Sequence, residues 1–416
     1  MASSTTVITL NHARKDMSTV YTSGMYIAML GRQPAIGMAE LERAFGDVRW
    51  FSHDTALVNT DALDIQRLGG TVKAGRVVAE LTGTDWRKTS MKLVQAYEDA
   101  WSNTSGKITL GISVYGFKVS PRDVQHTGLI LKSHLKSKGI SLRLIPNEQS
   151  ILSTATAHHN KLGLSPNKVE LLIVKGHSGK VIIAESTGSQ NITALARRDQ
   201  GRPARDAFVG MLPPKLAQIM VNLTGPQPPR ADDQLPPVLL DPFCGTGVLL
   251  QESVLLGYRP YGTDLSEKMI RYSRDNLNWL QDRFGLHFHW NLEVADAMEA
   301  KWLQPIDAIA CETYLGQPFS APPSNEKLGE VRRNCDHIIT EFLKNIGRQI
   351  KSGTPLCIAV PAWNDGKDNF SHLPLIKKLD QLGYGPVEFK NVNAKDLLYY
   401  RPDQVVAREL LVLEKI

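Results

Sequence analysis

The stretch from Val238 to Leu250 reads VLLDPFCGTGVLL, and it constrains the fold more than any other part of the chain. A short apolar strand ends at Asp241, the chain turns through Gly245 and Gly247, and an apolar helix follows. Open α/β sheets bind nucleotides at such a turn, at the carboxyl end of a strand. Glycine lets the backbone approach a ligand closely because it has no Cβ. We therefore predict an α/β domain with a nucleotide-type pocket at this turn.

Two features that the turn lacks narrow the choice of ligand. No lysine follows the last glycine, so the turn is not a phosphate-cradling Walker loop. The Gly-x-Gly spacing lacks the third glycine of a dinucleotide fingerprint, which leaves a nicotinamide dehydrogenase as a remote alternative. A carboxylate ahead of the turn would also repel a pyrophosphate. The turn therefore favours a cationic or amino-bearing ligand.

The turn resembles motif I of the amino-group methyltransferases that use S-adenosylmethionine. It is most similar to the DPFCGTG form found in RNA guanine-N2 methyltransferases. The resemblance implies that Asp241 lies near the methionine amino group and that Phe243 also contacts the cofactor. It further implies that Gly245 and Gly247 make room for the cofactor. The alternative is an ordinary strand-turn-helix in which Asp241 only caps the helix.

Two further acidic residues follow predicted strands. Asp264 stands 23 positions after Asp241, and a carboxylate about 20 positions after a glycine turn can bind a ribose diol. Asp264 could instead cap the helix that follows it. Asp296 follows the third strand, and the resemblance implies that it accepts a hydrogen bond from the adenine amino group. It could also be an ordinary turn residue.

The catalytic residues of the family follow its fourth strand, predicted here to end at Glu312. The family uses Asp or Asn, two prolines and an aromatic residue, which accept the amine hydrogens and stack on the base. Here the sequence reads CETYLGQP, so Glu312 takes the acidic place, Tyr314 supplies a ring one position early, and both prolines are absent. Glu is one methylene longer than Asp, which moves its oxygen by about 1 Å. Either Glu312 and Tyr314 act in adapted roles, or the chain is a catalytically silent RNA-binding homologue.

The segment 107–206 is strongly basic. It has 15 Lys and Arg against 6 Asp and Glu, a net charge of +9, while the whole chain carries +6. This distribution favours a polyanionic partner such as nucleic acid, although a solvated lysine-bearing surface is the alternative. The order of its strands and helices resembles a THUMP domain, which captures the acceptor end of tRNA. The best candidates for phosphate contacts there are Lys132, Lys136, Lys138, Arg143 and Lys161.

The stretch 197–206 carries four arginines interrupted by Gly and Pro, so we expect no regular helix in it. Arginine forks suit phosphate recognition, which makes Arg198 and Arg202 RNA-binding candidates. A hub of structural salt bridges is the alternative.

We expect a disordered lead-in at 1–20, an α+β module at 21–105, a THUMP-like domain at 106–190 and a Rossmann-like methyltransferase domain at 191–416. A proline-rich loop is expected at 224–237. No pair of cysteines has zinc-site spacing, so no metal is expected. No signal peptide or membrane-length apolar run is present in this sequence, which favours a cytoplasmic protein. The expected activity is S-adenosylmethionine-dependent methylation of guanosine N2 in tRNA, with rRNA or DNA amine methylation as the alternative.

Overall fold

The computed structural model describes residues 24–82, 85–206, 212–227, 235–303, 305–319, 321–364, 369–401 and 404–416. The predicted lead-in and residues 228–234 of the predicted loop lie outside these ranges. The chain divides into two compact units. The first holds the residues up to Pro34, Asp47–Gln66 and Thr71–Ile192, and the second holds Ala35–Gly46, Arg67–Gly70 and Thr193–Ile416.

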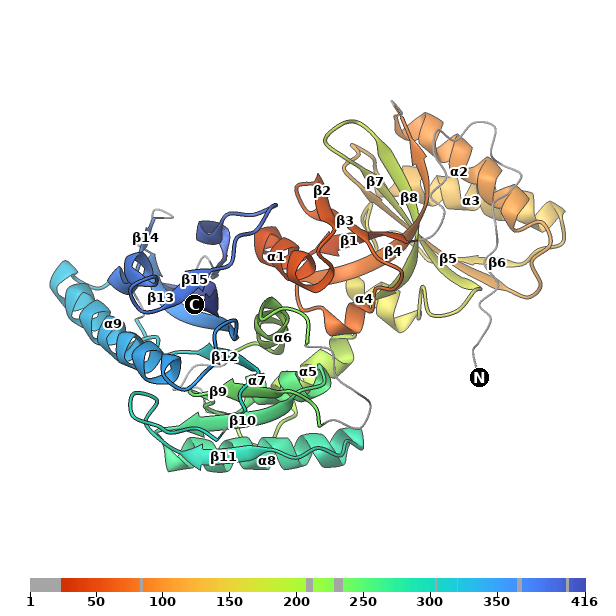
Figure 1. Ribbon diagram of the computed structural model, residues 1–416. Helices are drawn as coiled ribbons and strands as arrows, with labels where there is room; N and C mark the ends of the chain where they lie inside the picture. The colour runs from red at the N-terminus through yellow and green to blue at the C-terminus, as the bar shows by residue number, and fades with distance from the viewer. Residues whose placement is uncertain are drawn as a thin grey trace. The chain divides into compact units, whose positions relative to one another are not determined.

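The first unit contains an eight-stranded sheet in the order β2-β3-β1-β4-β8-β7-β5-β6 (Figure 1). Its strands are β1 (Met25–Leu30), β2 (Val48–Ser52), β3 (Thr55–Asn59), β4 (Thr71–Leu81), β5 (Ile108–Tyr115), β6 (Leu142–Leu144), β7 (Lys168–Lys175) and β8 (Val181–Ser189). β5 pairs with β6 and β7 in parallel, whereas β4 and β8 are antiparallel. Because β4 pairs with β8, the strands of the two predicted N-terminal modules join in one sheet.

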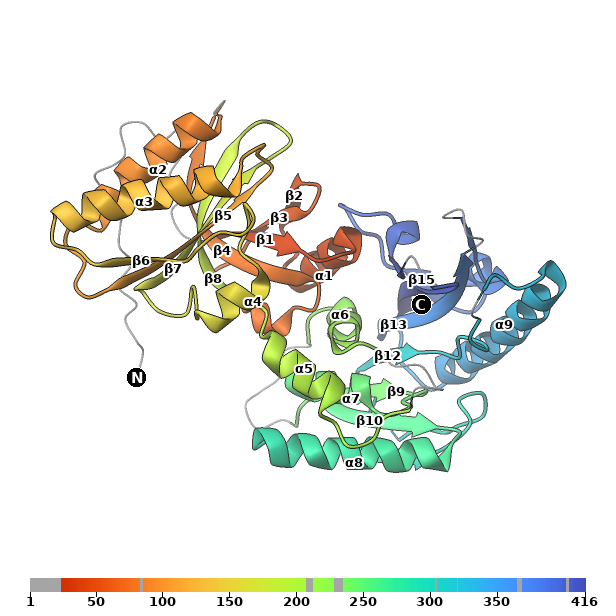
Figure 2. The same cartoon turned by 180° about the vertical axis from the view of Figure 1, so that it is seen from behind.

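Helices α2 (Trp86–Ala100) and α3 (Pro121–Ser137) cover one face of this sheet and lie beside each other (Figure 2). Leu93 of α2 and Leu131 of α3 share a buried cluster with Leu110 of β5. Each helix begins at a side-chain cap, Asp85 for α2 and Ser120 for α3. A short helix, α4 (Thr154–His159), follows β6.

The second unit contains a sheet in the order β11-β10-β9-β12-β13-β17-β15 (Figure 1). The strands on this path are β9 (Val238–Asp241), β10 (Arg259–Asp264), β11 (Asn291–Val294), β12 (Ala308–Glu312), β13 (Pro355–Asn364), β15 (Tyr384–Pro386) and β17 (Val406–Lys415). β14 (Phe370–Ser371) pairs with β13, and β16 (Leu398–Tyr399) pairs with β17. The strands from β11 to β13 are parallel, and β17 is antiparallel to β13. This is the expected Rossmann-like α/β fold.

Helices cover both faces of this sheet. The helices are α1 (Pro34–Phe45), α5 (Ile192–Gln200), α6 (Pro214–Leu223), α7 (Val248–Leu255), α8 (Glu267–Phe284) and α9 (Asn325–Gly347), with the short 3-10 helices η2 (Pro374–Lys378) and η3 (Ala394–Asp396). A third 3-10 helix, η1 (Ile65–Arg67), stands where the chain passes from the first unit to the second. Leu216 of α6 packs in a cluster with Leu239 of β9, and Phe342 of α9 packs in another with Leu240. Since neighbouring residues of a strand point to opposite faces, α6 and α9 lie on opposite sides of the sheet.

The expectation that 197–206 forms no helix is wrong for its first four residues, because α5 continues through Arg197 and Arg198 to Gln200. The interrupting residues, Gly201 and Pro203, come only after that point. None of the described helices is both long and apolar enough to span a membrane.

Candidate active site

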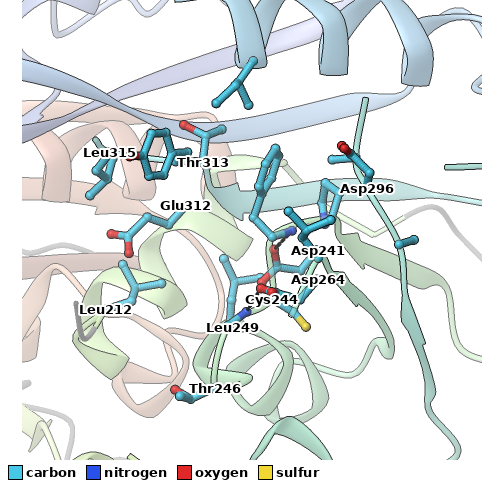
Figure 3. A pocket seen from close by; sticks show the side chains of 18 of the residues that line it. Leu212, Asp241, Cys244, Thr246, Leu249, Asp264, Asp296, Glu312, Thr313 and Leu315 are labelled. Carbon is cyan, nitrogen blue, oxygen red and sulfur yellow. Dashed lines mark hydrogen bonds between the residues drawn. The ribbon is translucent and has the colours of Figure 1, made fainter. Parts of the chain in front are cut away.

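A cavity of about 540 Å³ opens at the carboxyl ends of β9, β10 and β12 (Figure 3). This is the edge at which open α/β sheets bind ligands. The volume falls in the ordinary range of small-molecule pockets. The structure brings to this cavity seven of the eight residues predicted for the cofactor and for catalysis, namely Asp241, Phe243, Gly245, Asp264, Asp296, Glu312 and Tyr314.

The turn after β9 is held by hydrogen bonds to its own backbone. Asp241 Oδ1 accepts from the Phe243 amide at 3.1 Å, and Asp264 Oδ2 accepts from the Gly245 amide at 2.9 Å. Ser273 of α8 donates its hydroxyl to the Gly245 carbonyl at 2.8 Å. These bonds fix the turn between the ends of β9 and β10 and the first half of α8.

The two glycines of the turn have different surroundings. Gly245 has φ +51°, and an added Cβ there would meet nothing closer than the Phe243 carbonyl oxygen at 4.0 Å. Gly247 has φ +76°, and its Cβ would come within 2.8 Å of the Ser273 hydroxyl. Gly245 therefore borders the cavity. Gly247 is the predicted cofactor residue that does not line it, and its lack of a side chain lets α7 pack against α8.

Four carboxylates line the cavity, and three of them, Asp241, Asp264 and Glu312, are close enough to influence one another. Asp241 is buried, and burial raises its pKa well above the usual range, with the charges of Asp264 and Glu312 raising it further. Burial also raises the pKa of Asp264, against the two backbone hydrogen bonds from Ser266 and Gly245 that lower it. A bound cation would relieve this concentration of negative charge, because opposite charges at short range favour the ionised carboxylates. The site therefore fits a positively charged ligand and disfavours a pyrophosphate.

The two carboxylates predicted to bind the nucleoside, those of Asp264 and Asp296, each belong to a tight turn. Asp264 Oδ1 accepts from the Ser266 amide at 2.9 Å, and Asp296 Oδ1 accepts from the Met298 amide at 2.9 Å. These bonds use part of each carboxylate and leave lone pairs for a ligand. Leu265 lies beside them with 73% of its surface exposed, although it lines the cavity. An apolar side chain at this place can pack on a flat base.

The segment after β12 lacks the two prolines of the family pattern, and its hydrogen bonds fit this difference. The Thr313 amide and its hydroxyl both donate to the Ala359 carbonyl, each at 3.0 Å. Thr313 therefore satisfies the N–H that a proline at this place would lack. Tyr314 is 42% exposed at the cavity, so its ring is accessible for stacking. The Glu312 carboxylate accepts a hydrogen bond from Arg408 Nε. The sequence favoured a salt bridge for Arg408 over a substrate contact, but it did not indicate Glu312 as the partner.

A second hollow, of about 650 Å³, lies in the first unit. It is lined by the side chains of Lys107, Lys132, Lys136 and Arg143 together with residues 139–142 and Leu144. None of the described residues that line it is acidic. Three of these four cations were predicted to bind RNA phosphates, and Lys107, which directly precedes β5, was missed.

The other RNA-binding candidates lie elsewhere. Lys138 pairs with Glu98 at 2.9 Å, and Lys161 follows α4 in the left-handed region with φ +55°. Arg198 is buried in a two-bond ion pair with Glu252, at 2.6 and 3.1 Å. Arg202 is also buried, and its guanidinium has no hydrogen-bond partner in the described part of the chain. These four residues do not line the hollow.

Residues 202–373 match the family of RMKL-like methyltransferase domains. The matched segment contains the whole turn after β9 and the carboxylates Asp264, Asp296 and Glu312. This segment is a methyltransferase domain. The expected methyltransferase family and its Rossmann-like fold are confirmed, whereas the THUMP-like module stays a prediction.

Curated relatives match parts of the chain. A tRNA (guanine(10)-N2)-dimethyltransferase of Methanothermobacter thermautotrophicus is 33% identical over 171 residues, which are 40% of this chain and 44% of the relative. A protein of the same name from Pyrococcus abyssi is 34% identical over 120 residues, which are 28% and 32% of the two chains. This chain therefore matches less than half the length of these two relatives. The crystal structure of TrmN from Thermus thermophilus aligns with a TM-score of 0.49 at 16% identity, over 94% of this chain and 100% of that one.

Proposed function

We propose that this chain transfers a methyl group from S-adenosylmethionine to the exocyclic N2 amine of a guanosine in tRNA. The observation that carries the proposal is the cavity of the methyltransferase domain, where the carboxylates of Asp241, Asp264 and Glu312 meet at the ends of three neighbouring strands. The names of the curated relatives support the tRNA guanine amine as the substrate.

The residues of the cavity fit this cofactor. The Asp241 carboxylate suits the positively charged amino group of the cofactor's methionine, and the Asp264 carboxylate suits the ribose diol. Asp296 has an acceptor oxygen for the adenine amino group, and Leu265 offers an apolar surface to the ring. Gly245 leaves the backbone side of the turn open to the ligand.

When bound, the cofactor would supply an electrophilic methyl group for the nitrogen lone pair of the substrate, and the electrons of the broken C–S bond would stay on sulfur. The substrate nitrogen then carries an extra proton, which leaves to a carboxylate or to water. Glu312 would accept an amine hydrogen and turn the lone pair toward the methyl carbon. Tyr314 would stack on the base and hold its plane. Most of the acceleration from these residues comes from alignment, because little acid–base chemistry is needed.

The basic hollow of the first unit supports an RNA substrate. Four cations line one depression without an acidic residue, and each phosphate contact adds a salt-sensitive increment of affinity. Contacts of this kind position a nucleic acid without reading its sequence. A tRNA substrate also suits the cytoplasmic location expected from the sequence.

One observation favours a second candidate function, a catalytically silent RNA-binding protein. Glu312, which stands where the family has its amine-binding residue, is already engaged by Arg408. A carboxylate locked in a structural ion pair would leave the target amine without its acceptor.

Incubation of the full chain with methyl-labelled S-adenosylmethionine and with tRNA, rRNA fragments or duplex DNA tests the proposal. We expect label in tRNA. Label in rRNA or DNA instead would replace the substrate, and cofactor binding without any transfer would favour the silent RNA-binding protein.

A further inference from the structure

The ion pair between Glu312 and Arg408 lies at the edge of the candidate active site. Arg408 Nε donates to Glu312 Oε1, and the two side chains are only 11% and 16% exposed. Glu312 lines the cavity, whereas Arg408 stands on β17 of the C-terminal hairpin. The pair therefore joins the reaction centre to an element that does not itself line the cavity.

The register of the sheet explains how the two side chains meet. Glu312 pairs with Ala359 of β13, and Arg408 of β17 pairs with Pro361. Ala359 and Pro361 are two residues apart, so they point to the same face of β13. Glu312 and Arg408 share that face, and the long arginine side chain reaches across β13 to the end of β12.

Only one oxygen of the Glu312 carboxylate is used. Arg408 holds Oε1, and within the described parts of the chain no residue donates a hydrogen bond to Oε2. The side chain is not fully buried, and it borders the cavity (Figure 3). Oε2 is therefore available to accept a hydrogen from a substrate amine while Oε1 stays fixed.

A glutamate needs such support more than an aspartate does. Its extra methylene adds a rotatable bond, and ordering that bond costs conformational entropy each time the carboxylate is aligned. A displacement of about 1 Å at a reacting group can lower the rate about 100-fold. A charge-assisted hydrogen bond from the nearly buried Arg408 guanidinium holds Glu312 in one rotamer. Any other rotamer would break the ion pair and leave both charges uncompensated.

The geometry points to Arg408 as a positioning residue, which fixes Glu312 Oε1 so that Oε2 faces the substrate amine. This inference rests on the proposed methyl transfer. It explains how the site works with a glutamate in place of the shorter acidic or amide residue of the family. It also gives the ion pair a part in the reaction, where the silent RNA-binding alternative would make it only structural.

Three variants of the full chain test the role of Arg408. We expect Arg408→Ala to lower kcat for methyl transfer between about 10- and 100-fold. The affinity of this variant for S-adenosylmethionine, measured by calorimetry, should stay within about twofold of the wild-type value. The reason is that Arg408 pairs with Glu312 and not with the aspartates predicted to bind the cofactor. Arg408→Lys should recover part of kcat. The matched control is Lys344→Ala, which removes an exposed ion pair with Glu341 on α9 and should change neither quantity.

A double-mutant cycle separates positioning from an independent effect. Glu312→Gln keeps one acceptor oxygen but removes the charge that Arg408 holds. Adding Arg408→Ala to Glu312→Gln should therefore lower kcat by no more than about twofold. If the fold losses of kcat in the two single variants multiply in the double variant, Arg408 does not act through Glu312. That result would overturn the inference.

Three further outcomes would also overturn it. If Arg408→Ala keeps kcat within about twofold of the wild type, the ion pair is structural. If it lowers kcat, cofactor affinity and melting temperature together, Arg408 supports only the fold. A wild-type chain that binds cofactor but methylates no RNA refutes the proposed function, and this inference falls with it.

Discussion

The smallest features of the site are the two glycines of the turn after β9, and they have separate reasons to be glycine. Gly245 borders the cavity, where a side chain would occupy space open to a ligand. Gly247 lies at the start of α7, where a side chain would strike Ser273 of α8. In this turn, the first glycine of the Gly-x-Gly pattern meets a binding requirement and the second meets a packing requirement.

We predict that Gly247→Ala destabilises the second unit by about 2–4 kcal/mol. Left-handed φ costs an L-residue about 1–2 kcal/mol, and the close approach to Ser273 adds a similar overpacking cost. Gly353→Ala is the matched control, because Gly353 has φ +81° and nothing within 4 Å of an added Cβ. Chemical denaturation of both variants measures the difference. Equal losses of unfolding free energy would show that contact with Ser273 costs nothing.

Residues close to the turn and to the strand ends could be found from the sequence, because local order fixes where parallel strands end. Asp241, Asp264 and Glu312 reach one cavity for this reason. Arg408 and Lys107 could not be placed in the same way. Arg408 meets Glu312 only through the pairing of β12, β13 and β17, which a single sequence does not reveal.

Among the elements, α1 differs most from its expected place. The sequence put it in an N-terminal module, but the structure groups Ala35–Gly46 with the methyltransferase unit. Ile36 packs in the cluster of α6, and the Glu40 carboxylate accepts from the Gly69 and Gly70 amides at 2.8 and 2.7 Å. Its amphipathic pattern predicted a helix correctly, but such a pattern does not say which core receives the apolar face.

Glu40 should make the stability of this unit depend on pH. Burial raises its pKa to about 7, against hydrogen bonds that lower it, while an unfolded glutamate titrates near 4.5. Between these values the native state holds a proton that the unfolded state has lost, so unfolding free energy falls as pH rises from 4.5 to 7. The loss amounts to about 3 kcal/mol relative to Glu40→Gln, which cannot titrate.

Denaturation of wild type and Glu40→Gln at pH 4.5, 5.5, 6.5 and 7.5 measures this dependence. The difference in unfolding free energy between the two should change across the range and level off above pH 7. A constant difference would mean that Glu40 is ionised throughout, with its hydrogen bonds from the Gly69 and Gly70 amides and from Asn222 Nδ2 outweighing its burial.

In the molecule as a whole, the basic hollow that we propose for RNA and the acidic cavity that we propose for the reaction belong to different units. The basic hollow belongs to the first unit, and the acidic cavity belongs to the second. The sequence placed the basic charge in the segment 107–206 and a domain boundary near residue 190, and the first unit of the structure runs to Ile192. It did not show that the strands on both sides of residue 105 form one sheet.

The hollow yields a prediction for RNA binding. Changing Lys132, Lys136 and Arg143 to alanine together should weaken tRNA binding and reduce the slope of log K against log salt by about 2–3. Lys138→Ala is the comparison, because Lys138 is paired with Glu98 and should change the slope far less. An unaltered slope in the triple variant would place the RNA on another surface.

The proposed reaction places a methyl group on the N2 atom of a guanosine in tRNA. Mass spectrometry of nucleosides from tRNA treated with the full chain and S-adenosylmethionine tests it most directly. We predict N2-methylated guanosine with the wild type and none with Asp264→Ala, which lacks the carboxylate proposed to bind the ribose of the cofactor. Methylation of another atom would refute the proposed substrate, and equal methylation by Asp264→Ala would refute the assignment of this cavity to the cofactor.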